Sequence, residues 1–330
     1  MSASRFKVLE WSGLPEVAEV AVVRFRGEDR FRVEMVDGLD PPLSRDRKWI
    51  LNVSTQFGCP VGCPFCDAGG AFHGNLDAEE ILDQVRIGLA RHPGLAARCG
   101  KLKVHFSRMG EPALNDAVIQ ALDRLPAVAE APGLWACVAT TAPDCRDDWF
   151  EALREVKDRR FPGRFQLQFS IQSTDANARS RLIPARHWTL DRIARYGGRF
   201  HRPGDRKVVL NFALAQGIPF DPGVLRDGFD PEVFAVKLTP VNPTVRGRGF
   251  RTVLRGGDEA GIAQAVEALR LARYDVVVSV GDAREDQVGS NCGQAVLRLS
   301  AGTDPENPAF PSGPASRVGR SRPARGPAGP

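Results

Sequence analysis

Residues 49 to about 300 alternate between short apolar runs and amphipathic stretches, and this alternation constrains the fold more than any other feature. Seven apolar runs have the length of strands: Ile50–Thr55, Leu102–Ser107, Leu134–Thr140, Phe165–Ile171, Lys207–Ala213, Phe234–Thr239 and Tyr274–Val280. Helical periodicity lies between them at Ala78–Leu89, Ala117–Leu125, Trp149–Val156 and Glu259–Ala272. Such alternation implies parallel strands with right-handed crossovers. We therefore predict an α/β fold, a partial or complete (β/α) TIM-like barrel with its chemistry on loops that follow the strands.

The two ends of the chain differ from this core. Val17–Phe25 and Phe31–Val36 are alternating or β-branched, and the turn-like Gly27–Arg30 separates them, so residues 1–47 are expected to form a small β-hairpin lead-in. Residues 301–330 carry seven Pro, five Gly and four Arg with almost no large apolar side chains. Because such a segment buries too little surface to offset its ordering entropy, we expect a disordered tail. The expected core spans residues 48–300.

Composition excludes a membrane protein. Runs such as Val276–Val280 are too short to cross a bilayer, and residues 1–20 lack a basic start followed by an apolar stretch. We therefore expect a cytoplasmic protein with no membrane partner. The net charge of +5 and the isoelectric point near 8.9 are compatible with an RNA partner but do not require one.

Three of the seven cysteines, Cys59, Cys63 and Cys66, lie within eight residues. In a cytoplasmic chain this spacing indicates metal ligation rather than a disulfide framework. Three thiolates can hold a 4Fe–4S cluster whose fourth iron stays open. The alternative is structural zinc, which requires a fourth ligand, and His73 is the nearest candidate.

The C-x3-C-x2-C pattern, with Phe65 directly before the last cysteine, resembles that of the radical S-adenosylmethionine (SAM) superfamily. Further motifs resemble the RlmN/Cfr group, the adenine C2 and C8 methyltransferases of ribosomal and transfer RNA. In chain order these motifs are Val53-Ser54-Thr55-Gln56-Phe57-Gly58-Cys59, Asn75-Leu76, Met109-Gly110-Glu111-Pro112, Leu114-Asn115, Ser170-Ile171-Gln172 (Ser-Leu-His in the family), Arg181-Leu182-Ile183-Pro184, Pro240-Val241-Asn242-Pro243 and Ser290-Asn291-Cys292-Gly293-Gln294. They span about residues 48–298 in unbroken order.

The resemblance implies a role for each matching residue. Cys59, Cys63 and Cys66 would bind the cluster, beside Phe65, and Gly110 and Glu111 would contact the SAM amino group. Thr141 would contact the ribose or sulfonium, Ser170 and Gln172 would line the nucleoside, and Asn242 would hold the carboxylate or ribose side. Cys292 would be the catalytic cysteine: it is methylated by one SAM, and a radical from a second SAM converts that methyl into a carbon radical that adds to adenine.

The chain departs from the family at two places. Asn52 stands where the family has a second cysteine, and an amide can neither deprotonate carbon nor form a disulfide. Cys137 or Cys145 could supply the thiol if the fold brings one to the barrel mouth, and Glu19, in a loose match to a family Val-Glu element, could supply a base. Members of the family also carry an extra N-terminal helical domain, whereas we expect the residues before the cluster to form the hairpin and little else.

The resemblance predicts a methyltransferase that cleaves SAM at its cluster, with electrons from a donor such as flavodoxin or ferredoxin. Two substrate classes remain open: an adenine-containing ribosomal or transfer RNA, and a small molecule or peptide. A non-catalytic iron–sulfur or RNA-binding protein is the third hypothesis, and SAM cleavage would exclude it.

Overall fold

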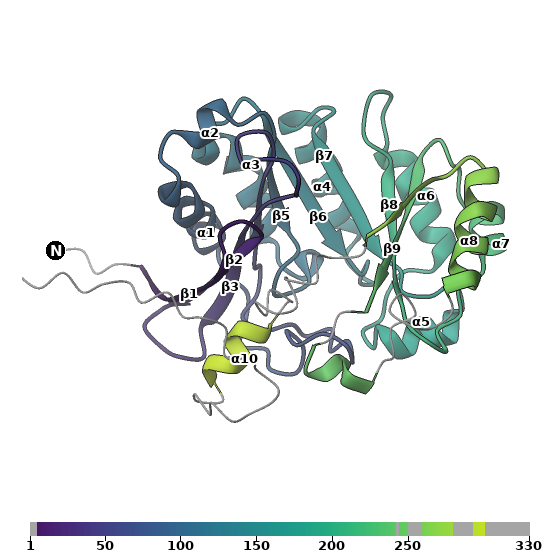
Figure 1. Ribbon diagram of the computed structural model, residues 1–330, viewed down its shortest axis with the longest axis horizontal. Coiled ribbons are helices and arrows are strands. Elements are labelled where there is room, and N and C mark those ends of the chain that lie inside the picture. Colours follow the sequence, from purple (N-terminus) through teal and green to yellow (C-terminus); the bar gives the residue numbers. More distant parts are fainter. Residues whose placement is uncertain (1–4, 242–243, 250–258, 280–292, 301–330) are drawn as a thin grey trace, which may run out of the picture.

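The computed structural model describes residues 5–241, 244–249, 259–279 and 293–300. They form one ten-stranded sheet whose strands are paired in chain order from β1 to β10. Because β1 and β10 are the two edges of this sheet, the sheet is an open, partial barrel (Figure 1). The predicted fold class is confirmed. In the described part of the chain no helix is long and apolar enough to span a membrane.

Antiparallel strands form the lead-in, and parallel strands form the rest. The lead-in contains β1 (Phe6–Leu14), β2 (Ala18–Phe25) and β3 (Arg32–Gly38), so it has one strand more than the predicted hairpin. Strand β3 pairs antiparallel with β4, and every later pair is parallel. The parallel strands are β4 (Trp49–Val53), β5 (Leu102–Phe106), β6 (Leu134–Thr140), β7 (Phe165–Ser170), β8 (Val208–Leu214), β9 (Phe234–Pro240) and β10 (Asp275–Val278). All seven coincide with the predicted runs to within three residues at either end.

Helices follow most of the parallel strands. They are α1 (Ala78–Arg91), α2 (Leu95–Arg98), α3 (Ala117–Ala129), α4 (Asp147–Arg160), α5 (Ala176–Leu182), α6 (Leu190–Phe200), α7 (Pro222–Gly228), α8 (Glu259–Leu271) and α10 (Gln294–Ser300), with 3-10 helices η1 (Pro112–Leu114) and η2 (Arg246–Gly249). A capping box fixes the start of α1: Asp77 accepts from the Glu80 N–H, and the Glu80 carboxylate accepts from the Asp77 N–H.

Alternating side chains of the parallel strands face two environments. In β5, for example, Leu102, Val104 and Phe106 are fully buried, whereas Lys103 and His105 between them are half-buried. The buried set packs against the helices in the main core, and the other set faces the interior of the partial barrel. Loops that follow parallel strands meet at one end of the sheet, so the loops after β4, β5, β6, β7 and β9 gather there.

The C-terminal helix α10 lies away from the helices of the core. It packs on β2 and β3, where Ala295 joins an apolar cluster with Val17, Val20, Val22 and Val36 (Figure 1). The last segment described is therefore attached to the first strands of the chain. The predicted tail, residues 301–330, is outside the described residues.

Candidate active site

The three clustered cysteines lie on the loop that follows β4, as predicted. The base of the loop closes where Phe57 N–H donates to the Gly74 carbonyl at 2.9 Å and His73 N–H donates to the Phe57 carbonyl at 2.8 Å. Gly58 (φ +82°) is required at this base, because a Cβ there would lie 1.5 Å from the Ala71 carbonyl oxygen. The base of the cysteine loop is therefore held in one conformation by these contacts.

All three cysteines are half-buried, and none of them forms a disulfide. Burial raises the pKa of the Cys59 thiol to about 12, although backbone N–H groups of Val61 and Gly62 donate to its sulfur. Burial also raises the pKa of the Cys63 thiol, followed by the charges of Cys66 and Cys59. A cation bound to these thiolates would offset this cost.

This donor set fits an iron–sulfur cluster, since three thiolates on one loop can each bind one iron. Within the residues described, no three His, Cys, Asp or Glu side chains, these cysteines included, converge on a single metal ion. In a 4Fe–4S cluster each thiolate binds a different iron, so the three sulfurs need not share one ion. The His73 side chain, the fourth ligand that zinc would need, is exposed at the base of the loop.

The Gly-Glu-Pro loop after β5 is fastened to the start of the cysteine loop. Gln56 accepts from the Glu111 N–H at 2.7 Å and donates to Asn75 at 2.8 Å. Asn115 donates to the carbonyls of Thr55 and Leu76 at 2.7 and 2.8 Å. The motifs that carry the resemblance are therefore hydrogen-bonded to one another, although they are separated along the chain.

Gly110 and Glu111 are the best-defined of the predicted SAM contacts. Gly110 has φ +107°, and a Cβ there would lie 2.7 Å from the side chains of Gln56 and Thr55. The buried Glu111 carboxylate accepts from Thr140 Oγ1, from the Ala113 N–H, and from both the N–H and Oγ1 of Thr141. Burial raises the pKa of Glu111, and these four donors act in the opposite direction.

Ser170, Gln172 and Phe65 also reach this end of the barrel. Ser170 is the half-buried last residue of β7, and Gln172 (φ +68°) ties β7 to β8, because its Oε1 accepts from the Ala213 N–H at 2.9 Å. Phe65 packs against Ala213, Ala215 and Val241 beside β8 and β9. Their assigned roles stay predictions, and Asn242 is outside the described residues.

Asn52 faces the barrel interior in the same strand row as His105 and Cys137. Its Oδ1 accepts from Ser107 Oγ at 3.4 Å. Cys137 is buried two strands away, where desolvation raises its thiol pKa, whereas Cys145 is exposed on the loop after β6. Of the two cysteines considered as substitutes, Cys137 is the one that faces the interior with Asn52.

Glu19 lies on the other face of the sheet. Strand register aligns it with Asp37 and, through β3, with Leu51, whose side chain packs under α1. Its carboxylate pairs with Arg91 at the end of α1 at 2.6 Å. A residue on the helix-covered face cannot act at the interior, so the structure does not support Glu19 as the base.

Two buried carboxylates that sequence reasoning missed fasten C-terminal segments to this site. Asp67, next to Cys66, accepts from the N–H groups of Val245 and Arg246 at 2.9 and 2.8 Å.

Glu34 is the second of these carboxylates, and it accepts from the N–H groups of Gly293 and Val296, both at 3.0 Å. The only signal in the sequence was an acidic residue within a mostly apolar strand or beside the cluster. Cys292 itself is outside the described residues.

Comparison with known proteins identifies the family of this chain. A probable RNA methyltransferase of Azoarcus sp. is 32% identical over 284 residues, which are 83% of this chain and 74% of that protein. The chain belongs to the RlmN/Cfr-like family of radical SAM RNA methyltransferases. Probable dual-specificity RNA methyltransferases RlmN of Frankia casuarinae and Thermus thermophilus are 32% and 28% identical over 73% and 77% of the chain. No family model matches.

Members of the family are longer than the part that matches. The match covers 57% of the Frankia casuarinae protein and 69% of the Thermus thermophilus protein. A crystal structure of a radical SAM methyltransferase from Sphaerobacter thermophilus has the same fold, with a TM-score of 0.68 at 21% identity over 89% of this chain and 82% of that one. The fold of this chain is thus found in a radical SAM methyltransferase.

Proposed function

We propose that this chain is a radical SAM enzyme that methylates an adenine in RNA. The observation that carries the proposal is the connection of the cysteine loop to the Gly-Glu-Pro loop through Gln56 and Asn115. The RNA methyltransferase names of its relatives favour RNA over a small molecule or peptide as the substrate.

Cys59, Cys63 and Cys66 would hold the 4Fe–4S cluster, which, with SAM and an electron from a donor such as flavodoxin or ferredoxin, supplies the radical chemistry. The chain's own residues would place the reactants. Gly110 leaves room where a side chain would clash, and Glu111 fixes Thr140 and Thr141 at the end of β6. Phe65, Ser170, Gln172 and Asn242 would complete the walls of the SAM site.

Cys292 would be the methyl carrier. In support, its neighbour Gly293 lies against the cysteine loop: a Cβ on Gly293 would be 2.3 Å from Ala68 N and from the Asp67 carbonyl carbon. Gly293 directly follows Cys292 in the sequence. Release of product without a cysteine at position 52 would then need another group, and the buried Cys137 is the thiol that shares the interior row with Asn52.

The test uses protein reconstituted with iron and sulfide without oxygen and supplied with SAM and a reductant. We expect 5′-deoxyadenosine, methyl groups incorporated into total RNA, and a methylated Cys292 peptide by mass spectrometry. Cys292→Ala should keep SAM cleavage and stop RNA methylation. SAM cleavage without any RNA methylation, but with a methylated small molecule from cell extract, would overturn RNA as the substrate.

A further inference from the structure

Glu34 is a fully buried glutamate in the middle of the lead-in strand β3. Strand register places it on the same face of the sheet as Val36 and Asn52, which is the interior face. An ionised carboxylate without partners would strongly destabilise such a position. The hydrogen-bond partners of Glu34 must therefore offset the cost of burying its charge.

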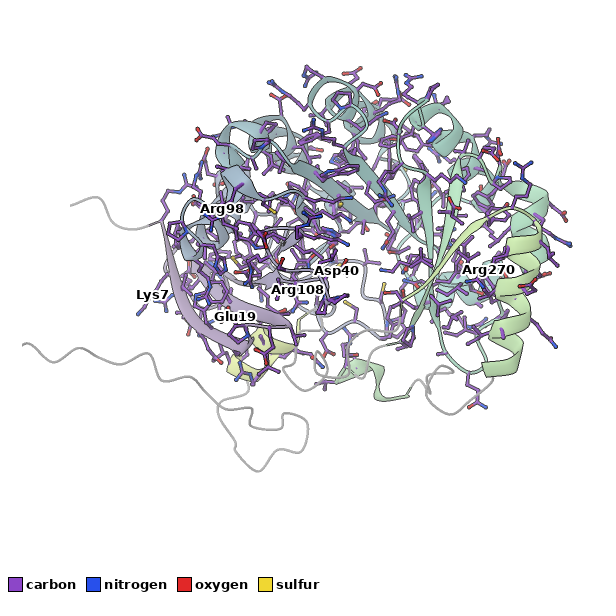
Figure 2. All side chains as sticks on the ribbon, turned by 45° about the horizontal axis from the view of Figure 1, so that its top comes forward. Lys7, Glu19, Asp40, Arg98, Arg108 and Arg270 are labelled. Atoms are coloured by element: carbon purple, nitrogen blue, oxygen red, sulfur yellow. The ribbon has the colours of Figure 1, made fainter. Side chains whose placement is uncertain are left out.

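The Glu34 carboxylate accepts hydrogen bonds from two segments that are far apart in the sequence. Oε2 accepts from Arg108 Nη2 at 2.5 Å and from the Gly293 N–H at 3.0 Å, and Oε1 accepts from the Val296 N–H at 3.0 Å. Arg108 begins the turn into the Gly-Glu-Pro loop, and Gly293 and Val296 begin the C-terminal segment. Figure 2 shows Arg108 near the lead-in strands, far from Arg270 on α8.

The backbone of Glu34 extends the same connection. Its carbonyl accepts from Ser54 Oγ at 2.5 Å, and Ser54 Oγ accepts from the Met109 N–H at 3.1 Å. One residue thus joins the lead-in, the start of the cysteine loop, the Gly-Glu-Pro loop and the C-terminal segment.

The backbone of the cysteine loop lies against Gly293 and also restricts its position. Its φ is +90°, and its missing Cβ would overlap the backbone of Asp67 and Ala68, directly after Cys66. Apolar contacts of Ala295 and Val296 with the lead-in bury surface but have no direction. Hydrogen bonds from a buried carboxylate are directional, so they can fix where the segment starts.

We propose that Glu34 is a positioning residue that holds the segment starting at Gly293 against the cysteine loop. The effect of Glu34 on methyl transfer rests on the proposed function, in which Cys292, the residue before this segment, carries the methyl group. Glu34 itself contacts neither substrate nor cofactor in this proposal.

The test compares Glu34→Gln with a matched control, Asp205→Asn. Asp205 is a half-buried carboxylate that likewise accepts from a cation (Lys157 Nζ, 2.6 Å) and from two backbone N–H groups (Gly163 and Arg202, 3.2 and 3.0 Å). It lies before β8, at the opposite end of the barrel. In Glu34→Gln an amide NH2 replaces one acceptor oxygen, so at least one backbone donor loses its partner.

Amide hydrogen exchange of the peptide covering residues 293–300 is the primary measurement, and it does not depend on activity. Glu34→Gln should raise exchange there by about tenfold or more, the effect of one lost charge-assisted hydrogen bond. Asp205→Asn should leave exchange in this peptide unchanged. Unchanged exchange in Glu34→Gln would overturn the proposal.

The ratio of methyl transfer to SAM cleavage is the second measurement. Glu34→Gln should keep 5′-deoxyadenosine formation and lower RNA methylation by about tenfold. Raised exchange with an unchanged ratio would reduce Glu34 to a purely structural contact and so overturn its role in the reaction. Failure of the proposed function has a different signature, because the wild-type protein would then methylate no RNA.

Gly293→Ala is the second variant, in case Glu34→Gln does not fold. The added Cβ meets the Asp67 and Ala68 backbone without changing any residue of the barrel core. It should raise exchange in the same peptide and lower the same ratio. Normal exchange in this variant would show that the close approach does not hold the segment and would count against the proposal.

Discussion

Glu111 accepts two hydrogen bonds from Thr141, one from the N–H at 2.8 Å and one from Oγ1 at 2.9 Å. Its other carboxylate oxygen accepts from Thr140 Oγ1 at 2.5 Å and from the Ala113 N–H at 3.0 Å. The sequence assigns Glu111 and Thr141 separate contacts with SAM, but in the structure they form one unit between the ends of β5 and β6. A change in either residue therefore also moves the other.

Glu111→Gln should destabilise the protein and weaken SAM binding together. The amide NH2 of glutamine would face N–H and O–H donors, so the free energy of unfolding should fall by about 1.5–3 kcal/mol. The dissociation constant for SAM should rise by about tenfold or more, because the end of β6 loses its anchor. Thermal unfolding and SAM titration of the reconstituted protein measure the two effects.

Thr141→Ser is the matched control for Glu111→Gln. It keeps the hydroxyl and the N–H that Glu111 accepts from, so stability and SAM affinity should stay close to those of the wild type. Wild-type SAM affinity in Glu111→Gln would remove this pair from the SAM site.

Gly110→Ala should be far more harmful than alanine at an unconstrained glycine that also has a positive φ. Gly110 (φ +107°) leaves no room for a Cβ next to Thr55 and Gln56, whereas Gly94 (φ +73°) has nothing within 4 Å of that position. Gly94→Ala should therefore cost only the left-handed backbone strain, about 1–2 kcal/mol. Chemical denaturation of both variants measures the difference, and equal losses would show that the Gly110 turn relaxes freely.

Removing any one of the cluster cysteines should abolish the iron–sulfur absorbance and SAM cleavage, because two thiolates rarely hold a cube. Cys59→Ala, Cys63→Ala and Cys66→Ala are the variants, and Cys145→Ser, at an exposed cysteine, is the control. Iron content, the visible spectrum and 5′-deoxyadenosine formation are the measurements. Full SAM cleavage in one of the three alanine variants would refute the ligand assignment.

Periodicity was sufficient to predict the parallel strands, but not every helix. Helix α6 contains Gly197 and Gly198, which weaken a helical pattern, so it was not predicted. The structure explains Gly197 by packing: a Cβ there would lie 2.2 Å from the ring of Phe234 on β9. Such a requirement comes from a residue far along the chain, and local sequence cannot reveal it.

The parts of the site that lie within one short sequence motif were predictable, whereas the parts that depend on the register of paired strands were not. The cysteine loop and the Gly-Glu-Pro loop could be recognised as motifs. Glu19 and Glu34, however, both have valines as near neighbours in the lead-in, so their local sequences look alike. Only the strand pairing shows that Glu19 faces α1, whereas Glu34 faces the interior of the barrel. Asp67 likewise acquires its partners from Val245 and Arg246, which the fold brings to it.

The last prediction concerns a cluster of positive charges where β5 begins. Lys101 Nζ lies 4.0 Å from the centre of the Trp135 ring, and the guanidinium of Arg206 lies 5.8 Å from the same ring. Burial, followed by the charges of Arg206, Lys103 and Lys48, lowers the pKa of Lys101 from 10.5 to about 8. Between these two pH values the folded chain binds fewer protons than the unfolded chain, so the contribution of Lys101 to the free energy of unfolding rises with pH.

Lys101→Met should therefore raise the melting temperature at pH 7, where the wild-type lysine is charged, and the gain should shrink toward pH 10. Methionine keeps the apolar stem beside Trp135 and removes the charge. Lys207→Met is the control, because Lys207 is a half-buried lysine at the same end of the barrel that pairs with Asp275 at 2.9 Å. It should give no gain at pH 7. If Lys101→Met is less stable than the wild type at pH 7, the contact of the ammonium with Trp135 outweighs repulsion from the neighbouring cations.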